Sequence, residues 1–505
     1  MANRFFLVGL RRINFLLGAS SLRRLVSSRA SPFNAMEEPP VQKEIMRMKS
    51  SIENPIPVLQ CWVEQGNRLS KSELRRIIKT LIKSKRFHHA LEIFTWMENQ
   101  KNVGMSPIDH SVKLELIIKI YGLAEAEEYF TCIPNLASRK AACLPLLRGY
   151  VRDRDTCKAE ALMVKLYELG LVVSPHPYNE MMKLYLASRD YIKVPLVIHE
   201  MKRNRILLNV LSYNLWMNAY GDGEGSGVAS AEMVFREMQN DHNVEVGWSS
   251  LATLVNIYIK AGQSDKAVLV LNTAEKKLST RNRLGYFFLM TLYASLKDEE
   301  GVLRLWEDSK DVPGRMTCAN YMCVLSCLVK IGDLVLAERI FIEWESNCRK
   351  YDVRVSNVLL GAYMRNGLTE KAEWLHLHTL EKGGCPNYKT WEILMEGFVK
   401  SQKMDKAIVA MKGAFGMLNK CDWRPPHALV MVIAEHFEKL GNLEDLNEYV
   451  KDIHKYGLAT LSLYKILLRM HVFADKPACH VLEMMDKDNI QVDDETLPII
   501  EVLKG

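Results

Sequence analysis

The chain has few of the features that mark membrane proteins and disulfide scaffolds. None of its apolar runs reaches the roughly 18 residues that a helix needs to span a membrane, so we expect no membrane insertion. Its 11 cysteines are scattered and include no Cys-x-x-Cys pair, which indicates reduced thiols. Only 17 of its 505 residues are proline, and most of these stand at expected turns or ends. This composition agrees with a helical protein that has no disulfide framework.

Enzyme motifs are incomplete as well. The triplet His436-Phe437-Glu438 has the H-x-E form of zinc deaminases, but no Pro-Cys-x-x-Cys follows it and Cys479 is the only cysteine downstream. The Gly-rich segment 221–227 lacks the Lys-Ser/Thr pair of a phosphate loop, and we expect an inserted flexible turn there. We therefore predict no catalytic residue, no metal site and no cofactor.

Acidic residues are missing from the first 36 positions. This segment holds six arginines, five serines and no lysine. On a helical projection Phe6, Leu10, Ile13 and Leu17 share one face, and Arg4, Arg11 and Arg12 lie opposite. An amphipathic, Arg-rich and acid-free start predicts a mitochondrial transit peptide over 1–36, with a plastid address as the alternative and a disordered basic tail as the other interpretation. Residues 37–70 are expected to form a helical cap or linker.

A periodic alanine is the strongest positive signal. It returns about every 35 residues, each time four residues before a bulky side chain. Successive alanines lie 36, 33, 72, 36, 70, 35 and 35 residues apart, so two intervals span two periods. The alanines are Ala90, Ala126, Ala159, Ala231, Ala267, Ala337, Ala372 and Ala407. A fixed period of this length predicts a solenoid of stacked repeats.

One period, residues 353–387, shows the nature of the unit. Apolar residues recur at helical spacing, Gly367 interrupts them, and a second helical run follows until Gly383, Gly384 and Pro386. This pattern predicts a helix hairpin. Two short helices cannot bury their own apolar faces, so each hairpin must pack on its neighbours.

These residues resemble the pentatricopeptide repeat family, helical repeats that bind RNA in organelles, and most of all its P type from plant organelles. The resemblance covers roughly residues 71–497 and rests on the 35-residue period, Tyr178-Asn179 and Tyr213-Asn214 at helix starts, and the Cys-Pro-Asn ending at 385–387. Further support comes from glycine at position 15 of the unit, alanine at position 20 and methionine at position 27. The glycines are Gly262, Gly332, Gly367 and Gly441, and the methionines are Met97, Met201 and Met238. A tetratricopeptide solenoid is the competing interpretation, but its period is 34 and its position 8 is small, whereas position 8 here is mostly large.

The expected fold is therefore all-α: a right-handed superhelical solenoid of about twelve helix-turn-helix repeats of ~35 residues. We expect units to start near 71, 109, 140, 175, 210, 248, 283, 318, 353, 388, 427 and 461, with a half-unit and a tail at 498–505. A Tyr or Phe at position 11 supports this register. The register at 109 is doubtful, and the unit at 210 carries an insertion.

The charge outside the first 36 residues is small. The whole chain is +7 and the segment 1–36 contributes +6, which leaves about +1 for the rest. RNA binding would then need cations concentrated on one surface. Position 13, at the end of the first helix, is basic in seven units: Lys83, Arg152, Lys260, Lys330, Arg365, Lys400 and Lys439.

Stacked units would bring these side chains into a row, and the resemblance implies that position 13 faces backbone phosphates. The alternative is that Lys and Arg simply favour the last turn of a helix. The first unit adds a denser cluster, in which Arg75, Lys79 and Lys83 share one helix face. It is either a polyanion contact or a solvated face.

The family resemblance also implies that position 5 and position 35 of a unit read one base. Asn179 with Asn209 and Asn357 with Asn387 are then pairs associated with pyrimidines, and Asn214 has only Gly247 as its partner position. Asparagine offers both a donor and an acceptor to a base edge. Position 5 departs from this pattern in most other units, for example at Leu144, Phe287 and Met322.

Together these patterns predict a non-catalytic protein, monomeric, that binds single-stranded organellar RNA and acts in mitochondrial RNA metabolism or translation. The alternative is a structural or adaptor subunit of a mitochondrial ribonucleoprotein, such as the mitochondrial ribosome, whose groove mainly holds protein. Neither the target transcript nor the exact cleavage site of the transit peptide follows from the sequence.

Overall fold

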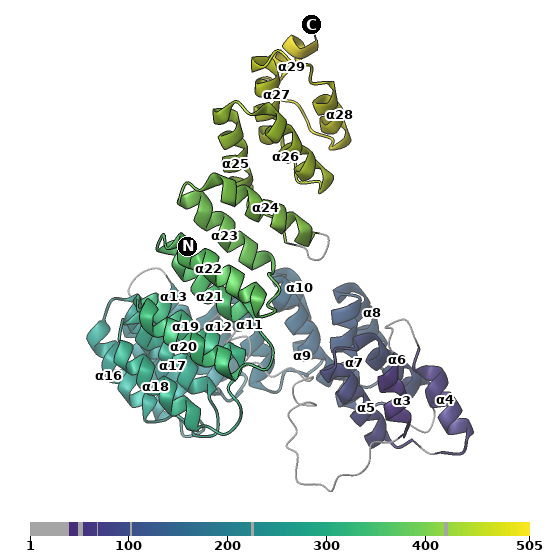
Figure 1. Cartoon of the computed structure of the whole chain (residues 1–505). Coiled ribbons are helices and arrows are strands. Elements are labelled where there is room, and N and C mark those ends of the chain that lie inside the picture. The colour runs from purple at the N-terminus through teal and green to yellow at the C-terminus, as the bar shows by residue number, and fades with distance from the viewer. Residues whose placement is uncertain are drawn as a thin grey trace. The chain divides into compact units, whose positions relative to one another are not determined.

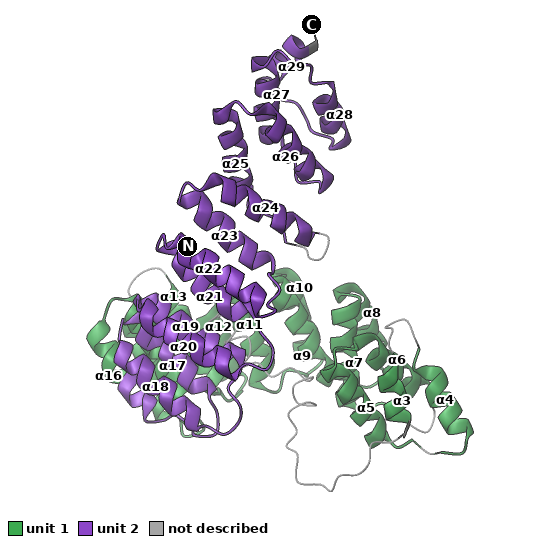
Figure 2. Ribbon diagram, in the orientation of Figure 1, with its two compact units in different colours: residues 1–270 green, residues 271–505 purple. Residues whose placement is uncertain are grey.

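The computed structural model describes residues 40–48, 54–67, 69–100, 104–223, 227–418 and 423–504. Within these ranges the chain forms 27 helices and no strand (Figure 1). The helices divide into two compact units, residues 1–270 and 271–505 (Figure 2). The prediction of an all-α fold is confirmed, whereas the expected transit peptide at 1–36 and residues 224–226 of the inserted turn lie outside the described residues.

The described part of the first unit starts with two short helices and continues as alternating helix pairs. Its helices are α3 (Pro40–Arg47), α4 (Ile56–Glu64), α5 (Lys71–Lys83), α6 (Phe87–Asn99), α7 (Pro107–Ile120), α8 (Leu123–Cys132), α9 (Leu136–Asp153), α10 (Thr156–Glu168), α11 (Pro175–Ala187), α12 (Lys193–Arg203), α13 (Val210–Asp222), α14 (Val228–Asn240) and α15 (Trp248–Lys260). Helix α16 (Ser264–Glu275) contains the boundary between the two units.

The second unit repeats the same alternation. Its helices are α17 (Leu284–Ser295), α18 (Glu299–Asp311), α19 (Cys318–Ile331), α20 (Leu334–Asn347), α21 (Val353–Arg365), α22 (Thr369–Glu381), α23 (Tyr388–Lys400), α24 (Met404–Leu418), α25 (His427–Leu440), α26 (Leu443–Lys455), α27 (Leu461–Phe473), α28 (Cys479–Lys487) and α29 (Leu497–Lys504). The residues expected as a C-terminal tail thus form α29, which packs on α27.

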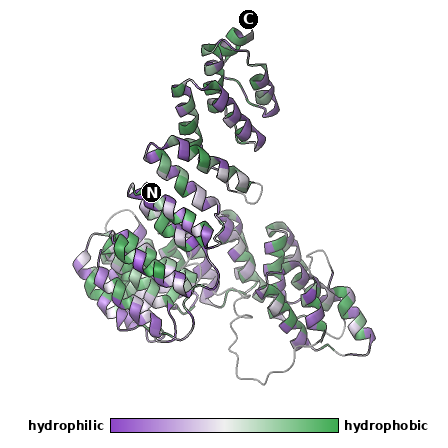
Figure 3. Cartoon of the chain, viewed as in Figure 1, coloured by the Kyte–Doolittle hydropathy of each residue, from purple (hydrophilic) through white to green (hydrophobic). Residues whose placement is uncertain are grey.

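The packing is that of stacked hairpins. In most pairs the first helix packs on the second helix and also on the first helix of the next pair, as in α11 with α12 and α13 or α21 with α22 and α23. Most helices carry both hydrophobic and hydrophilic residues (Figure 3). All eight periodic alanines are fully buried. An alanine lets helices approach closely, so its return every 35 residues follows from this packing.

The observed helix starts agree with the expected register in most units. They coincide with the expected start or differ by one residue at 71, 175, 210, 248, 283, 318, 353, 388, 427 and 461. The start near 140 was wrong, because Asn135 accepts a hydrogen bond from the Ser138 N–H and begins α9 at Leu136. The doubtful unit at 109 starts two residues earlier, where Ser106 caps α7.

The ends of the first helices share one turn. In ten pairs the backbone N–H of position 16 donates to the carbonyl of position 11, and position 15 has a positive φ between 50° and 110°. This is the Schellman ending of a helix, which favours glycine at position 15. Glycine fills it in four pairs, but Lys85, Arg154, Arg189, Lys297, Gln402 and Asp475 fill it in six.

Polar contacts join consecutive pairs on the side of the second helices. Each contact unites a glutamate that directly follows a periodic alanine, the position-11 tyrosine of the next pair and a lysine of that pair's second helix. Tyr185 Oη and Lys193 Nζ donate to Glu160 Oε1 at 2.9 and 3.0 Å. Equivalent contacts join Glu232 with Tyr258 and Lys266, and Glu338 with Tyr363 and Lys371. Hydrogen bonds from Lys266 and Tyr258 hold the pKa of Glu232 below its usual value.

Candidate nucleic-acid interface

A recurring three-residue site lies where one first helix meets the start of the next. Asn179 on α11, Asn209 at the cap of α13 and Ser212 in the first turn of α13 build one example. Asn179 Nδ2 donates to Asn209 Oδ1 at 3.2 Å, and Ser212 Oγ donates to Asn179 Oδ1 at 2.8 Å. The backbone N–H of Ser212 also donates to Asn209 Oδ1 at 3.0 Å. We call this arrangement the cap site.

The second example lies 178 residues further along the chain and has the same contacts. Asn357 Nδ2 on α21 donates to Asn387 Oδ1 at 3.2 Å, and Thr390 Oγ1 donates to Asn357 Oδ1 at 3.0 Å. The backbone N–H of Thr390 donates to Asn387 Oδ1 at 3.1 Å. The two asparagine pairs expected from the sequence are therefore in direct contact, one in each compact unit.

The contacts fix the orientation of the cap amides. Because Asn209 Oδ1 accepts from the backbone N–H of Ser212, its Nδ2 must point the other way. That Nδ2 donates to none of the described residues, and the same holds for Nδ2 of Asn387. Both cap asparagines are half-buried, whereas Asn179 and Asn357 are buried. Each cap site thus presents an oriented amide donor group without a partner from the described chain.

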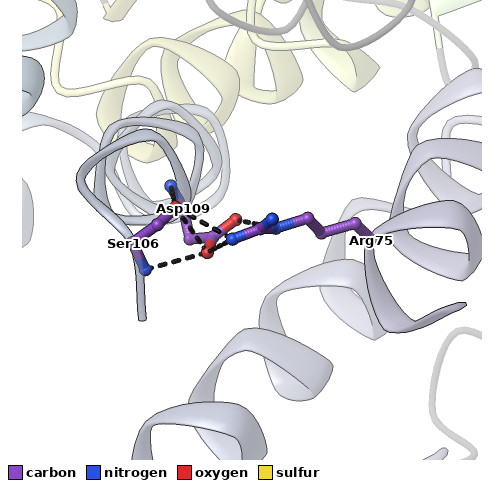
Figure 4. A network of polar contacts seen from close by, with 3 residues as sticks. All are labelled: Arg75, Ser106 and Asp109. Atoms are coloured by element: carbon purple, nitrogen blue, oxygen red, sulfur yellow. Dashed lines mark hydrogen bonds and ion pairs between the residues drawn. The ribbon is translucent and has the colours of Figure 1, made fainter. Parts of the chain in front are cut away.

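Arg75 occupies position 5 in the first pair, and its cap site is formed by other residue types, with Ser106 and Asp109 as its partners (Figure 4). Its Nε donates to Asp109 Oδ1 at 2.9 Å and its Nη2 to Asp109 Oδ2 at 2.6 Å. Nη2 also donates to Ser106 Oγ at 3.0 Å. Burial alone raises the pKa of Asp109, but the hydrogen bonds from Arg75 and Ser106 outweigh it and bring the pKa below its usual value. This bidentate ion pair satisfies the charge of Arg75 within the chain.

The last cap site of the array is also ionic. Lys465, at position 5 on α27, donates through Nζ to Asp493 Oδ2 at 2.6 Å and to Glu495 Oε2 at 2.9 Å. Asp493 accepts from the N–H of Thr496 three residues later, just as Asn209 accepts from Ser212. Ionic cap sites therefore occur in the first pair of the array and in its last complete pair.

Asn214 stands alone at its position. It lies on α13, and the cap of α15 is Gly247, which has no side chain to pair with it. Its Oδ1 is buried and accepts no hydrogen bond from the described residues. The predicted base-reading residue is thus present without the partner that the other two pairs have.

The basic residues at position 13 all lie in the last turn of their helices, as expected. Neighbouring position-13 side chains touch each other in two places. Lys260 pairs with Asp222, the position-13 residue of the preceding pair, and Lys330 Nζ donates to Ser295 Oγ of the preceding pair at 2.6 Å. Consecutive position-13 side chains therefore do lie next to each other within each compact unit.

The remaining predicted phosphate contacts differ in their surroundings. Arg152 pairs with the neighbouring Asp153. Burial lowers the pKa of the Arg365 guanidinium, which nevertheless stays charged at any ordinary pH. Lys79 is half-buried, and its interaction lies within the chain. Lys83, Lys400 and Lys439 are exposed and make no ion pair with described residues.

Sequence reasoning missed the third member of each cap site. Ser212, Thr390 and Asp109 stand three residues after their cap residues, and each takes part in a capping box. The capping box was visible as a local pattern. Its contact with position 5 of the preceding pair spans 33 or 34 residues and could be found only from the fold.

The described residues contain no group of three or more His, Cys, Asp or Glu side chains arranged to hold a metal ion. None of the described helices is long and apolar enough to cross a membrane. All described cysteines are free thiols.

Comparison with known proteins identifies the family. Residues 161–223 match the model of the pentatricopeptide repeat domain, and residues 355–383 match that of the PPR repeat. The chain is 55% identical over 473 residues to pentatricopeptide repeat-containing protein At5g27460 of Arabidopsis thaliana, covering 92% of this chain and 96% of the relative. The chain therefore belongs to the pentatricopeptide repeat family, which confirms the resemblance seen in its sequence.

The chain is also similar to two further proteins. The mitochondrial pentatricopeptide repeat-containing protein At4g21705 of Arabidopsis thaliana is 31% identical over 481 residues, with 94% of this chain and 97% of the relative covered. The crystal structure of maize PPR10 in complex with an 18-nt psaJ RNA element gives a TM-score of 0.44 at 16% identity, over 88% of this chain and 68% of that chain.

Proposed function

We propose that this protein binds single-stranded RNA without catalysis and acts in mitochondrial RNA metabolism or translation. One observation carries the proposal: two cap sites with the same contacts, Asn179–Asn209 and Asn357–Asn387, each leave an oriented amide donor group unused. An unstacked base in single-stranded RNA exposes its Watson–Crick edge, which such a group can hydrogen-bond. Family membership supports the proposal, because pentatricopeptide repeats are RNA-binding repeats.

The geometry at these two sites favours a base edge that accepts hydrogen bonds. Oδ1 of Asn209 and Asn387 already accepts from its own chain, so each cap amide offers only N–H donors. Uracil and cytosine have carbonyl oxygens that accept from such donors, as guanine has, so the expectation of pyrimidines rests on the family resemblance. A bulky apolar side chain at position 5, such as the buried Phe287, contributes no such hydrogen bond and supports only contact with a base face.

A selection from random single-stranded RNA with the full chain tests the proposal. Asn179 belongs to the fourth unit and Asn357 to the ninth, so one base per unit places their bases five nucleotides apart. We expect pyrimidines at two positions five apart in the selected sequences, and an affinity that falls with salt. No salt-dependent RNA binding would exclude the function and favour the adaptor role in a mitochondrial ribonucleoprotein.

The mitochondrial location rests on the first 36 residues and on relatives. Several relatives carry the word mitochondrial in their names, although At5g27460 does not. We expect a fusion of residues 1–36 to direct a reporter to mitochondria, because the segment is acid-free and Arg4, Arg11 and Arg12 lie opposite its apolar face. Changing Arg11, Arg12, Arg23 and Arg24 to Glu should abolish import. Import into plastids, or unchanged import of the Glu variant, would contradict this location.

A further inference from the structure

Position 15 of the repeat carries basic side chains in a backbone conformation that disfavours them. Lys85, Arg154, Arg189 and Lys297 have φ values between 58° and 62°. In this left-handed region the Cβ of an L residue crowds the following carbonyl oxygen, and glycine avoids the crowding. Four other pairs of the array do use glycine at the same point. Four helix ends therefore keep a cation where glycine would be more stable.

The side chain at position 15 points away from the protein. A Cβ atom built onto Gly262, Gly332, Gly367 or Gly441 would meet no atom within 4 Å. The side chains of Arg189 and Lys297 are exposed and make no hydrogen bond or ion pair with described residues. Packing within the chain therefore gives no reason for a long basic side chain at this position.

The placement of Arg189 and Lys297 complements the row at position 13, whereas Lys85 and Arg154 stand in pairs that already have Lys83 and Arg152 there. The four pairs with glycine at position 15 all have a cation at position 13, namely Lys260, Lys330, Arg365 and Lys439. Two pairs have Ala187 or Ser295 at position 13, and in these Arg189 or Lys297 supplies a cation two residues later. Lys330 lies next to this point, because its Nζ contacts Ser295. Position 15 thus fills gaps in the row of cations.

We propose that Arg189 and Lys297 bind backbone phosphates of RNA and continue the position-13 row through pairs that lack a cation there. The proposal rests on the proposed function and adds binding residues that the repeat pattern does not assign. The ligand is a polyanion with regularly spaced phosphates, held by side chains that leave successive helix ends at similar points. Contacts of this kind do not distinguish base sequences.

The test compares three kinds of variant in the full chain with a labelled oligouridine as the probe. Arg189→Gly and Lys297→Gly together remove both cations and relieve the left-handed backbone. We expect the slope of log affinity against log salt to fall by about 0.7 for each lost contact, which is about five-fold in affinity per contact at about 0.1 M salt. The thermal midpoint should rise in the same variant, so weaker binding could not be attributed to a damaged fold.

Two matched variants separate charge from backbone. Arg189→Gln with Lys297→Gln keeps the left-handed residues and should weaken RNA binding as much as the glycine variant, without raising the thermal midpoint. Gln402 has φ 58° at the same position and no charge. Gln402→Gly should therefore raise the midpoint and leave RNA affinity unchanged, and Gln402→Lys should increase the salt slope by about 0.7.

The outcomes distinguish the phosphate role of Arg189 and Lys297 from the proposed RNA-binding function. If the unmodified chain binds RNA and the Arg189/Lys297 variants retain its affinity and salt slope, the phosphate role is overturned and the proposed function stands. If the unmodified chain shows no salt-dependent binding, both are overturned. If the glutamine variant loses only stability, the cations serve the negative end of the helix dipole instead.

Discussion

The cap site at Arg75 and the cap sites at Asn179 and Asn357 are formed by the same positions of the repeat but by different side chains. In each, a position-5 side chain meets the cap and the third residue of the next first helix. At Arg75 an ion pair uses both carboxylate oxygens of Asp109. At the asparagine sites the cap amide keeps its donors. The backbone arrangement is therefore the same in all three cap sites. Two or three side chains determine whether the site forms an internal ion pair or presents an amide donor.

The largest difference between the two kinds of cap site concerns stability. The side chain of Asp109 is only 2% exposed, so Arg75→Met would leave a buried carboxylate without its cation. We expect the free energy of unfolding of the first pairs to fall by about 3 kcal/mol. Hydrogen exchange of α5 and α7 measures it locally. Lys83→Met, at the exposed end of the same helix, is the control and should change stability by less than about 0.5 kcal/mol.

A double variant completes this prediction. Arg75→Met with Asp109→Asn removes both charges and should recover most of the lost stability, since no unpaired charge remains buried. Equal protection of α5 and α7 from hydrogen exchange in the Arg75→Met variant and in the unmodified chain would show that the ion pair contributes nothing to stability.

The second prediction converts one kind of site into the other. Arg75→Asn, Ser106→Asn and Asp109→Ser together copy the side chains of the Asn179 site. Three units separate position 75 from position 179, so a pyrimidine preference should appear three nucleotides away from the existing one. We expect about a tenfold preference, because the two N–H donors of the new cap amide can each add a neutral hydrogen bond of about 1 kcal/mol or less. Selected RNA with no new preference would mean that side chains beyond the cap site control base reading.

The third prediction removes one asparagine site. Asn357→Ala removes a side chain that holds the cap amide of Asn387 in place, so the base contact of that amide should weaken. We expect relaxed base identity at a single position and an affinity for the preferred RNA about five-fold lower, which corresponds to about 1 kcal/mol. Asn214→Ala is the matched control, because Gly247 leaves Asn214 without a cap partner. Binding assays with a series of single-base changes measure both. A loss spread evenly over all positions would argue for a structural role of Asn357.

The smallest expected effect is a difference in acid sensitivity. The pKa of Asp109 lies below its usual 3.8, so the stability that it contributes is present above that pH and is lost as the pH falls below it. The asparagine sites have no group that titrates there. At low pH the N–H of Asp109 should therefore lose more of its protection from hydrogen exchange than the N–H of Ser212. Equal behaviour of the two amides would mean that the charge of Asp109 does not hold the start of α7.

The sequence predicted the parts of this structure that repeat and missed those that join one repeat to the next. Helix hairpins and buried alanines follow from a 35-residue period and local patterns, and the two asparagine pairs were expected from the family resemblance. The contact of Arg75 with Asp109 was missed, and Arg75 was expected to face a polyanion instead. Asp109 lies in the unit of doubtful register, and no local pattern connects residues 34 apart. The left-handed conformation of Arg189 was also missed, because in a sequence this helix ending is usually recognised by a glycine.

The glutamate contacts between consecutive pairs affect how such a chain can change in length. Glu160, Tyr185 and Lys193 come from three helices, and the same three residue types recur around Glu232 and Glu338. Each of these contacts joins one pair to the next, and the three are built from the same residue types. Whole pairs can therefore be exchanged between such contacts while each glutamate keeps a compatible partner, whereas an insertion of a few residues inside a pair would shift its tyrosine and lysine away from the preceding glutamate. Such a gene grows most safely by duplicating complete periods, and a designed chimera should be cut at the boundaries of pairs.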